Sequence, residues 1–98
     1  MAPDVVVYTA PFCFYCVRAK QLLTERGISF RELDVRAVEG GRRALSAQSG
    51  RTSVPQIFVD GDFIGGYYEL AQMDREGVLL DELLHREPGD KAPPSSDR

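Results

Sequence analysis

Apolar residues recur along the chain with two different periods, and this alternation predicts the order of strands and helices. The first run, Val5-Val6-Val7-Tyr8, is short and β-branched and has a proline on either side, which predicts a buried central strand. Residues 14–26 are mostly good helix formers, and Gly27 is placed to end that helix. Period-two alternation then resumes and predicts a second strand over residues 28–35.

The middle of the chain predicts a weaker helix and a hairpin. Residues 37–49 offer a helix only a thin apolar stripe, and Gly50 is expected to end it. Two apolar runs, 56–59 and 63–64, flank the dipeptide Asp60-Gly61. Such a dipeptide between apolar runs is typical of a tight antiparallel hairpin.

Two short helical segments and a polar tail complete the chain. The first segment carries Leu70 and Met73, and Gly77 separates it from the second. The second is expected to place four leucines on one face: Leu79, Leu80, Leu83 and Leu84. Residues 86–98 contain no large apolar side chain and cannot offset the entropy of ordering, so they are expected to form a disordered tail. The folded domain is therefore expected to span residues 1–85.

The predicted element order is β-α-β-α-β-β-α-α. The first two strands are joined by a helix and should run parallel with a right-handed crossover. The last two should pair as an antiparallel hairpin. The expected class is α/β, with a mixed four-stranded sheet flanked by helices, which is the thioredoxin-like fold.

Composition and charge narrow the class of protein. A chain of 98 residues that is 43% hydrophobic and 28% charged is typical of one globular domain. Its formal net charge of -3 argues against a nucleic-acid partner. No apolar run approaches the roughly 20 residues of a membrane helix, and the first residues lack the pattern of a signal peptide. We therefore expect a cytoplasmic protein, in which a lone pair of cysteines is more plausibly catalytic than structural.

The two cysteines, Cys13 and Cys16, lie where the first strand gives way to the first helix. In the first helical turn, unpaired backbone N–H groups and the positive end of the helix dipole would favour the nucleophilic thiolate form of Cys13. Cys16, one turn further on the same face, could then resolve a mixed disulfide formed at Cys13. The spacing predicts a redox-active dithiol.

Two other interpretations of the cysteines are weaker. A zinc site usually needs four ligands, and besides the cysteines the chain offers only His85, expected at a solvated helix end, so no metal site is predicted. A purely structural disulfide across two residues would close so small a loop that its entropic contribution is slight.

Two further segments are expected beside the dithiol. Pro55 precedes the third strand, and a cis Val54–Pro55 bond would leave the Val54 backbone N–H and C=O free to pair with an extended substrate. An ordinary trans turn is the alternative, but beside such a dithiol we expect the cis form. The pair Gly65-Gly66 ahead of a helix would let the backbone approach a ligand and offer N–H groups to a carboxylate. Taken alone, such a pair more often forms only a turn.

Together these segments resemble the glutaredoxin family, and most closely its small bacterial dithiol members. The matching stretches are Tyr8-Thr9 leading to Cys13–Lys20, then Ser49–Phe58, then Ile64-Gly65-Gly66 followed by Glu69-Leu70. The resemblance runs from about Val5 to Leu84. Each stretch is unspecific alone, but the three in this order are highly specific.

The resemblance implies reduction of protein disulfides and glutathione mixed disulfides. Glutathione would be the reducing co-substrate, with no permanently bound cofactor, and disulfide-containing or glutathionylated proteins would be the partners of a monomer. Cys13 would be the nucleophile and Cys16 the resolving thiol. The implied glutathione-binding residues are Tyr15, Arg51, Ser53, Val54, Pro55, Gly66, Tyr67 and Tyr68.

Within that set the resemblance implies distinct contacts. Tyr15 would line the glutathione groove, and the Arg51 guanidinium would meet the glycine carboxylate. Val54 would pair with the cysteinyl backbone, and the amides of residues 66–68 would hold the γ-glutamyl carboxylate.

Three positions depart from the family pattern. Phe14 replaces the usual proline, which returns a backbone N–H to the helix start and releases φ, so we expect a changed reduction potential. Tyr68 stands where the family commonly has an acidic residue that holds the glutathione amino group, and only Glu69 keeps the charge. Because a tyrosine cannot replace that charge-assisted hydrogen bond, we expect weaker glutathione affinity or a preference for other thiols. Ala10 replaces a lysine that many members carry close to the nucleophile, which removes one cation that would stabilise the thiolate.

Two alternative functions remain at this point. The chain could be a thioredoxin-like electron donor served by a flavoprotein reductase, which a weakened glutathione site would suit. It could also bind an iron–sulfur cluster as a dimer, as some glutaredoxins without the active-site proline do, although the bulk of Phe14 would obstruct such a dimer.

Overall fold

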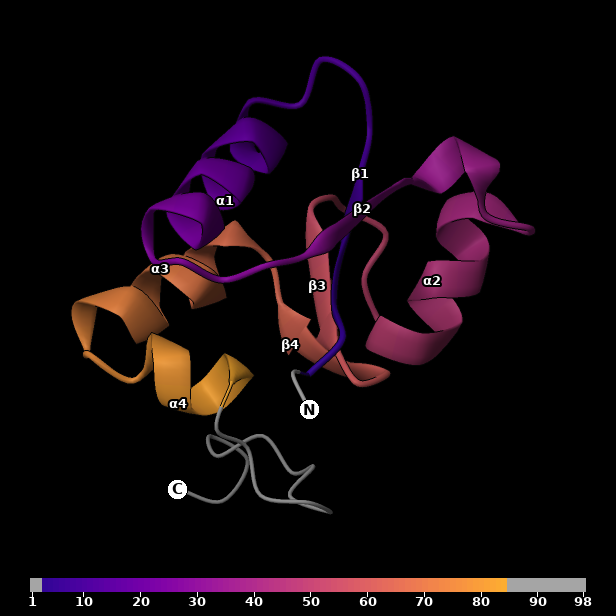
Figure 1. The fold of residues 1–98 in the computed structure, drawn as a ribbon. Helices are drawn as coiled ribbons and strands as arrows, with labels where there is room; N and C mark the ends of the chain where they lie inside the picture. Colours follow the sequence, from indigo (N-terminus) through magenta and orange to yellow (C-terminus); the bar gives the residue numbers. More distant parts are fainter. Residues whose placement is uncertain (1–2, 85–98) are drawn as a thin grey trace.

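The computed structural model describes residues 3–84, and its central element is the strand that leads to the dithiol (Figure 1). The strands are β1 (Val5–Thr9), β2 (Arg31–Asp34), β3 (Gln56–Val59) and β4 (Asp62–Gly65), and they lie in the order β2-β1-β3-β4. β1 runs parallel to β2 and antiparallel to β3, which is antiparallel to β4. The predicted thioredoxin-like fold with a mixed four-stranded sheet is confirmed.

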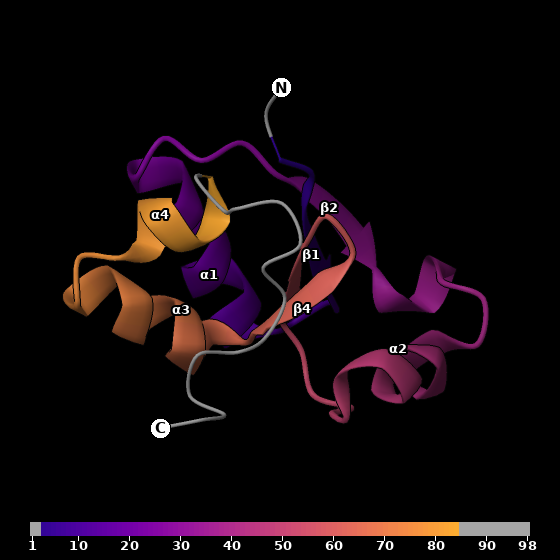
Figure 2. The same ribbon diagram turned by 90° about the horizontal axis from the view of Figure 1, so that it is seen from below.

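Helices cover both faces of this sheet. They are α1 (Phe14–Glu25), the short 3-10 helix η1 (Val35–Ala37), α2 (Gly41–Ser49), α3 (Tyr67–Arg75) and α4 (Leu79–Leu83). Figure 2 shows α1, α3 and α4 on one side of the sheet and α2 on the other. None of the helices within residues 3–84 is long and apolar enough to cross a membrane.

The two faces of the sheet have cores of unequal size. The buried residues of the larger core, which includes side chains of α1, α3 and α4, are Val5, Val7, Ala19, Leu23, Ile28, Ile57, Val59, Leu70, Leu79 and Leu83. The smaller core, on the α2 side, consists of Val35, Leu45 and Phe58, with Tyr8 packed against it. β1 and β3 contribute to both cores because they occupy the middle of the sheet, which explains their continuous apolar runs.

The second strand is shorter than predicted, because part of its apolar alternation belongs to the end of α1. Gly27 has a φ of +73°, and the N–H of Ile28 donates to the carbonyl of Leu23 at 2.9 Å. This arrangement is a Schellman motif, whose apolar contact buries Ile28 without any strand. At the other end, the Asp34 carboxylate accepts the backbone N–H of Arg36 at 2.8 Å and starts η1, so Val35 lies outside β2.

Two helix predictions also need correction. α2 begins at Gly41 rather than at residue 37, because Gly40 and Gly41 have φ values of +83° and +58° that interrupt the helical path. In α4, Leu79 and Leu83 are buried, whereas Leu80 is 43% exposed, so the four leucines do not share one face. His85 and the predicted tail over residues 86–98 lie outside the described residues.

Candidate active site

The sulfur of Cys13 caps the first helix. Cys13 is the N-cap residue of α1, one position before the first helical turn, and its Sγ accepts a hydrogen bond from the Cys16 backbone N–H at 3.1 Å. An N-cap side chain ordinarily supplies an oxygen for this bond. Here the sulfur takes that role, so it lies against the positive end of the α1 dipole.

The two thiols have different environments. Cys13 is partly exposed, whereas Cys16 is only 2% exposed. Burial raises the pKa of the Cys16 thiol to about 12, and the hydrogen bond to Cys13 adds to that rise. Cys13 is therefore the sulfur that an incoming disulfide contacts first, and Cys16 lies buried beside it as a protonated thiol.

The loop before β3 lies beside Cys13. The Val54–Pro55 peptide bond is cis, as expected. The Cys13 thiol donates to the Val54 carbonyl at 3.8 Å, a long contact typical of sulfur. The structure thus brings residues 13 and 54 together across 41 positions of the chain.

The buried amide of Gln56 holds this loop in place and was not identified from the sequence. Its Nε2 donates to the carbonyls of Arg51 and Ser53 at 2.8 and 2.9 Å, and the residue is 1% exposed. A polar residue that opens an otherwise apolar strand is the sequence signal that could have indicated this role.

Arg51 and Glu69 form an ion pair at the site that the resemblance did not imply. Arg51 Nη1 and Nη2 donate to the two oxygens of Glu69 at 3.0 and 2.9 Å. Glu69 Oε1 also accepts the Gly66 N–H at 2.8 Å. The Arg51 hydrogen bond, together with the Gly66 amide, lowers the pKa of Glu69 to about 2. Of the three amides expected to hold a carboxylate, that of Gly66 is therefore already bonded.

Three tyrosines form one cluster across the start of α3. Tyr15 stacks on Tyr67 with 5.7 Å between ring centroids, and its ring lies 5.7 Å from that of Tyr68. The hydroxyls of Tyr15 and Tyr68 are 3.4 Å apart. Tyr68 remains 69% exposed. The cluster joins the Cys13–Cys16 turn to α3, so these three predicted site residues lie together.

Arg18 and Phe14 extend this aromatic surface. The Arg18 guanidinium lies 5.5 Å from the Phe14 ring centroid and 5.4 Å from that of Tyr67, and it donates to the Tyr67 hydroxyl at 3.2 Å. Phe14 is 66% exposed, and Phe12, before the dithiol, is fully exposed with a φ of +60°. The surface around Cys13 is therefore largely aromatic.

A thioredoxin-like fold with one accessible and one buried cysteine at a strand-to-helix turn defines a thiol–disulfide oxidoreductase. The glutaredoxin family model matches residues 5–64. The chain is 46% identical over 81 residues to glutaredoxin 3 of Escherichia coli, covering 83% of this chain and 96% of that protein. It is 42% identical over 82 residues to a glutaredoxin of Pseudomonas aeruginosa, covering 84% and 96%. The chain belongs to the glutaredoxin family.

Solved structures agree with this assignment. The glutaredoxin of Brucella melitensis matches with a TM-score of 0.75 at 40% identity, covering 85% of this chain and 90% of that one. A buckwheat glutaredoxin solved as a complex with glutathione matches with a TM-score of 0.75 at 28% identity, covering 83% and 76%. The Cys13/Cys16 pair is accordingly that of a dithiol glutaredoxin, which acts as a glutathione-dependent disulfide reductase.

Proposed function

We propose that this chain reduces glutathione mixed disulfides as well as protein disulfides, with Cys13 as the nucleophile and Cys16 as the resolving thiol. The observation that carries the proposal is the position of Cys13 Sγ, partly exposed between the Cys16 N–H and the Val54 carbonyl. A substrate sulfur that reaches Cys13 would also meet the Val54 backbone, whose N–H donates no hydrogen bond to any residue among 3–84. An extended peptide could add to this backbone as a short strand.

We further propose that glutathione lies between this loop and the start of α3. The residues assigned to it are Tyr15, Arg51, Ser53, Val54, Pro55, Gly66, Tyr67 and Tyr68. The first N–H groups of α3, those of Tyr67 and Tyr68, would take the γ-glutamyl carboxylate, since helix N-termini favour anions. The Arg51 guanidinium would bind the glycine carboxylate of glutathione. Because Arg51 already donates to both oxygens of Glu69, the glycine carboxylate must compete with Glu69 for these donors.

The reaction proceeds by successive thiol–disulfide exchanges. Cys13 thiolate attacks a disulfide, forms a mixed disulfide and releases one thiolate. With a glutathione mixed disulfide, Cys13 takes the glutathione and the protein leaves; a glutathione thiolate then attacks the sulfur of the glutathione bound to Cys13, which forms glutathione disulfide and releases the Cys13 thiolate. With a protein disulfide, the Cys16 thiolate attacks the Cys13 sulfur, forms the Cys13–Cys16 disulfide and releases the substrate as a thiolate that takes a proton from solvent. Two glutathione molecules then reduce the Cys13–Cys16 disulfide and leave as glutathione disulfide. Cys16 is therefore dispensable when the substrate is a glutathione mixed disulfide. It is needed when the substrate is a protein disulfide.

The deciding experiment follows turnover of a small glutathione mixed disulfide with glutathione and glutathione reductase, and in parallel with thioredoxin reductase alone. We expect activity only in the first assay, and activity only in the second would favour a thioredoxin-like donor instead. Cys16→Ser is expected to retain most of the activity on the mixed disulfide and to lose reduction of protein disulfides. Loss of both activities in a folded Cys16→Ser protein would contradict the one-thiol route.

We also propose that the chain acts as a monomer in the cytoplasm, with glutathione and glutathionylated or disulfide-bonded proteins as its partners. The support for this location is that both cysteines of the sequence belong to the redox pair, which leaves none for a structural disulfide.

A further inference from the structure

A groove with both apolar and charged lining residues reaches the dithiol from the side of β1, α1 and β2. Its lining includes Thr9, Cys13, Cys16, Lys20 and Glu32, and it includes none of the eight residues that we assign to glutathione. The groove is therefore separate from the proposed glutathione site, and it is the route by which solvent approaches the buried Cys16.

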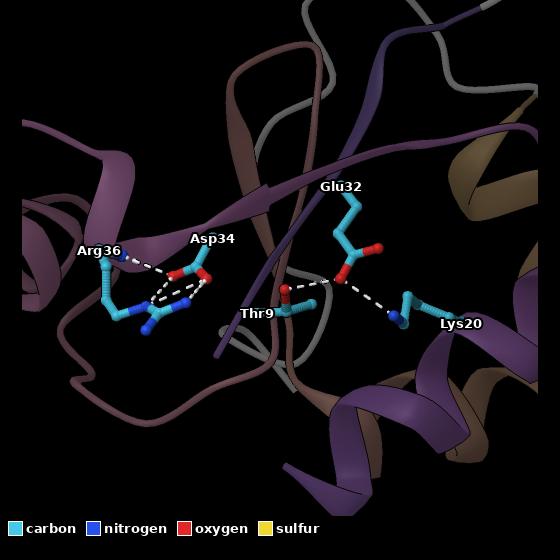
Figure 3. A network of polar contacts seen from close by, with 5 residues as sticks. All are labelled: Thr9, Lys20, Glu32, Asp34 and Arg36. Carbon is cyan, nitrogen blue, oxygen red and sulfur yellow. Dashed lines mark hydrogen bonds and ion pairs between the residues drawn. The ribbon is translucent and has the colours of Figure 1, made fainter. Parts of the chain in front are cut away.

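An ordered ion pair lies in this groove next to Cys16. Lys20 Nζ donates to Glu32 Oε2 at 2.9 Å, and the buried Thr9 hydroxyl donates to the same oxygen at 2.8 Å (Figure 3). Lys20 follows Cys16 by four positions on α1, so the two side chains occupy the same face one turn apart. Thr9 and Glu32 therefore hold the ammonium group in the groove that the resolving thiol also lines.

The ionisable groups around this thiol come from two elements. α1 and its N-cap supply Lys20 and Cys13, and β2 supplies Glu32 and Asp34. The Asp34 carboxylate is already paired with Arg36 at 2.7 Å. β1 contributes no ionisable side chain to the groove, and β3 carries no charged residue.

The charged residues of α3, which packs on α1, do not enter this groove. Glu69 is held by Arg51, and Asp74 is held by Arg26. On α1 itself, the Arg18 guanidinium donates to the Tyr67 hydroxyl and does not line the groove. Lys20 is consequently the one cation that lines the groove within residues 3–84, and Glu32 is the carboxylate that offsets it.

We propose that Lys20 and Glu32 are positioning residues with opposite effects on the resolving step: the Lys20 ammonium favours the Cys16 thiolate, and the Glu32 carboxylate opposes it by neutralising Lys20. In that step the Cys16 thiol loses its proton to the solvent of the groove. The resulting thiolate attacks the Cys13 sulfur of the mixed disulfide, the Cys13–Cys16 disulfide forms, and the substrate leaves as a thiolate that is then protonated.

The electrostatics of Cys16 agree with this geometry. Burial raises the pKa of the Cys16 thiol to about 12, whereas the charge of Lys20 acts in the opposite direction. A thiol with so high a pKa is almost wholly protonated at neutral pH, so the rate of the second attack follows the small thiolate fraction. Any change in the charge near Cys16 therefore appears directly in that rate.

The test uses the full chain in its reduced form, mixed with an aromatic disulfide whose released thiol absorbs light. The first thiol is released when Cys13 attacks, and the second when Cys16 resolves the mixed disulfide; Cys16→Ser identifies the second phase by removing it. We expect Lys20→Met to slow the second phase relative to the first by about fivefold at neutral pH, and Glu32→Gln to accelerate it by a similar factor. The pH at which the second phase reaches half its maximal rate should be higher for Lys20→Met and lower for Glu32→Gln than for the wild type.

A purely structural ion pair would behave differently, because either substitution breaks it and both would then act in the same direction. Changes of the same sign, or an unchanged ratio of the two phases, would overturn the proposal. The matched controls are Arg26→Met and Asp74→Asn, which break a 2.6 Å ion pair between the C-cap of α1 and α3; neither residue lines the groove. We expect both controls to leave the ratio of the phases unchanged, and a ratio altered by them as much as by the groove variants would also overturn it.

Discussion

The Glu69 carboxylate meets the Arg51 guanidinium through two parallel hydrogen bonds of 3.0 and 2.9 Å, and one of its oxygens also accepts the Gly66 N–H. A single side chain thus joins the loop before β3 to the start of α3. These two segments are the ones between which we place glutathione. The response of the protein to acid and the effect of a side chain at Gly65 both depend on Glu69.

Acid is expected to destabilise the protein partly through Glu69. Its pKa lies near 2 in the folded protein against an ordinary value of 4.5, so the folded state binds the proton less readily than the unfolded state. The contribution of Glu69 to the free energy of unfolding is therefore complete above about pH 4.5 and is lost as the pH falls towards 2. Glu69→Gln should lose less stability than the wild type over that range, measured as the urea midpoint against pH.

The control for this experiment is Glu39→Gln, which removes an exposed carboxylate that forms no ion pair among residues 3–84. Its acid dependence should match that of the wild type. If Glu69→Gln lost stability as steeply as Glu39→Gln between pH 4.5 and 2, the ion pair would have no role in acid stability.

Any side chain at Gly65 is expected to destabilise the folded protein. Its φ is +147°, and a Cβ atom there would lie 2.5 Å from the Cβ of Glu69. Gly61 has a φ of +88° but no atom within 4 Å of such a Cβ, so it measures the backbone strain alone. We expect Gly61→Ala to cost about 1 kcal/mol and Gly65→Ala about 2–3 kcal/mol in chemical denaturation. Equal costs would show that the contact with Glu69 relaxes freely.

Tyr68 is expected to limit the affinity for glutathione. It is largely exposed, its hydroxyl lies beside that of Tyr15, and it carries no charge to bind an ammonium group. Tyr68→Asp should lower the apparent KM for glutathione about tenfold, the effect of one hydrogen bond to a charged group. Tyr68→Asn has the same shape without the charge. The steady-state assay with glutathione reductase measures both, and a similar fall in KM for Asn would attribute the effect to loss of the ring.

Phe14 is expected to influence the reduction potential. It is the first residue of α1, where proline is tolerated without breaking a helical hydrogen bond, so Phe14→Pro should fold. The substitution removes one of the N–H groups at the helix start, next to the sulfur of Cys13, and so stabilises the thiolate less. We expect the midpoint potential to become more negative by about 10 mV or more in equilibrium redox titrations. Coincident curves, or a shift to a more positive potential, would contradict this.

Local rules predict the parts of the fold that local interactions decide. The hairpin is an example, because Asp60 and Gly61 both adopt positive φ, of 52° and 88°, as a two-residue turn of this kind demands. β2 is the opposite case. It is an edge strand whose first three residues are exposed, so apolar alternation could not indicate its bounds.

The same distinction holds for the active site. The dithiol and the cis proline follow from short motifs, and the structure places both at one point. The pairing of Arg51 with Glu69 joins residues 18 positions apart, and no periodic pattern encodes it. The polar residue at the start of β3 marks Gln56 as unusual, but the sequence does not show which backbone carbonyls its amide bonds.

Because Cys13 caps α1, the redox state of the protein is coupled to the stability of that helix. In the reduced protein the N–H of Cys16 meets a sulfur that can carry a full negative charge, and a hydrogen bond to an ionised acceptor is stronger than one to a neutral one. Once that sulfur enters a disulfide, it has no charge to offer and α1 keeps a poorer cap. By thermodynamic linkage, whatever the cap adds to the helix in one oxidation state it also adds to the preference for that state. A substitution that changes the stability of the first turn of α1 therefore also changes the reduction potential of Cys13, and oxidation of Cys13 changes the stability of that turn.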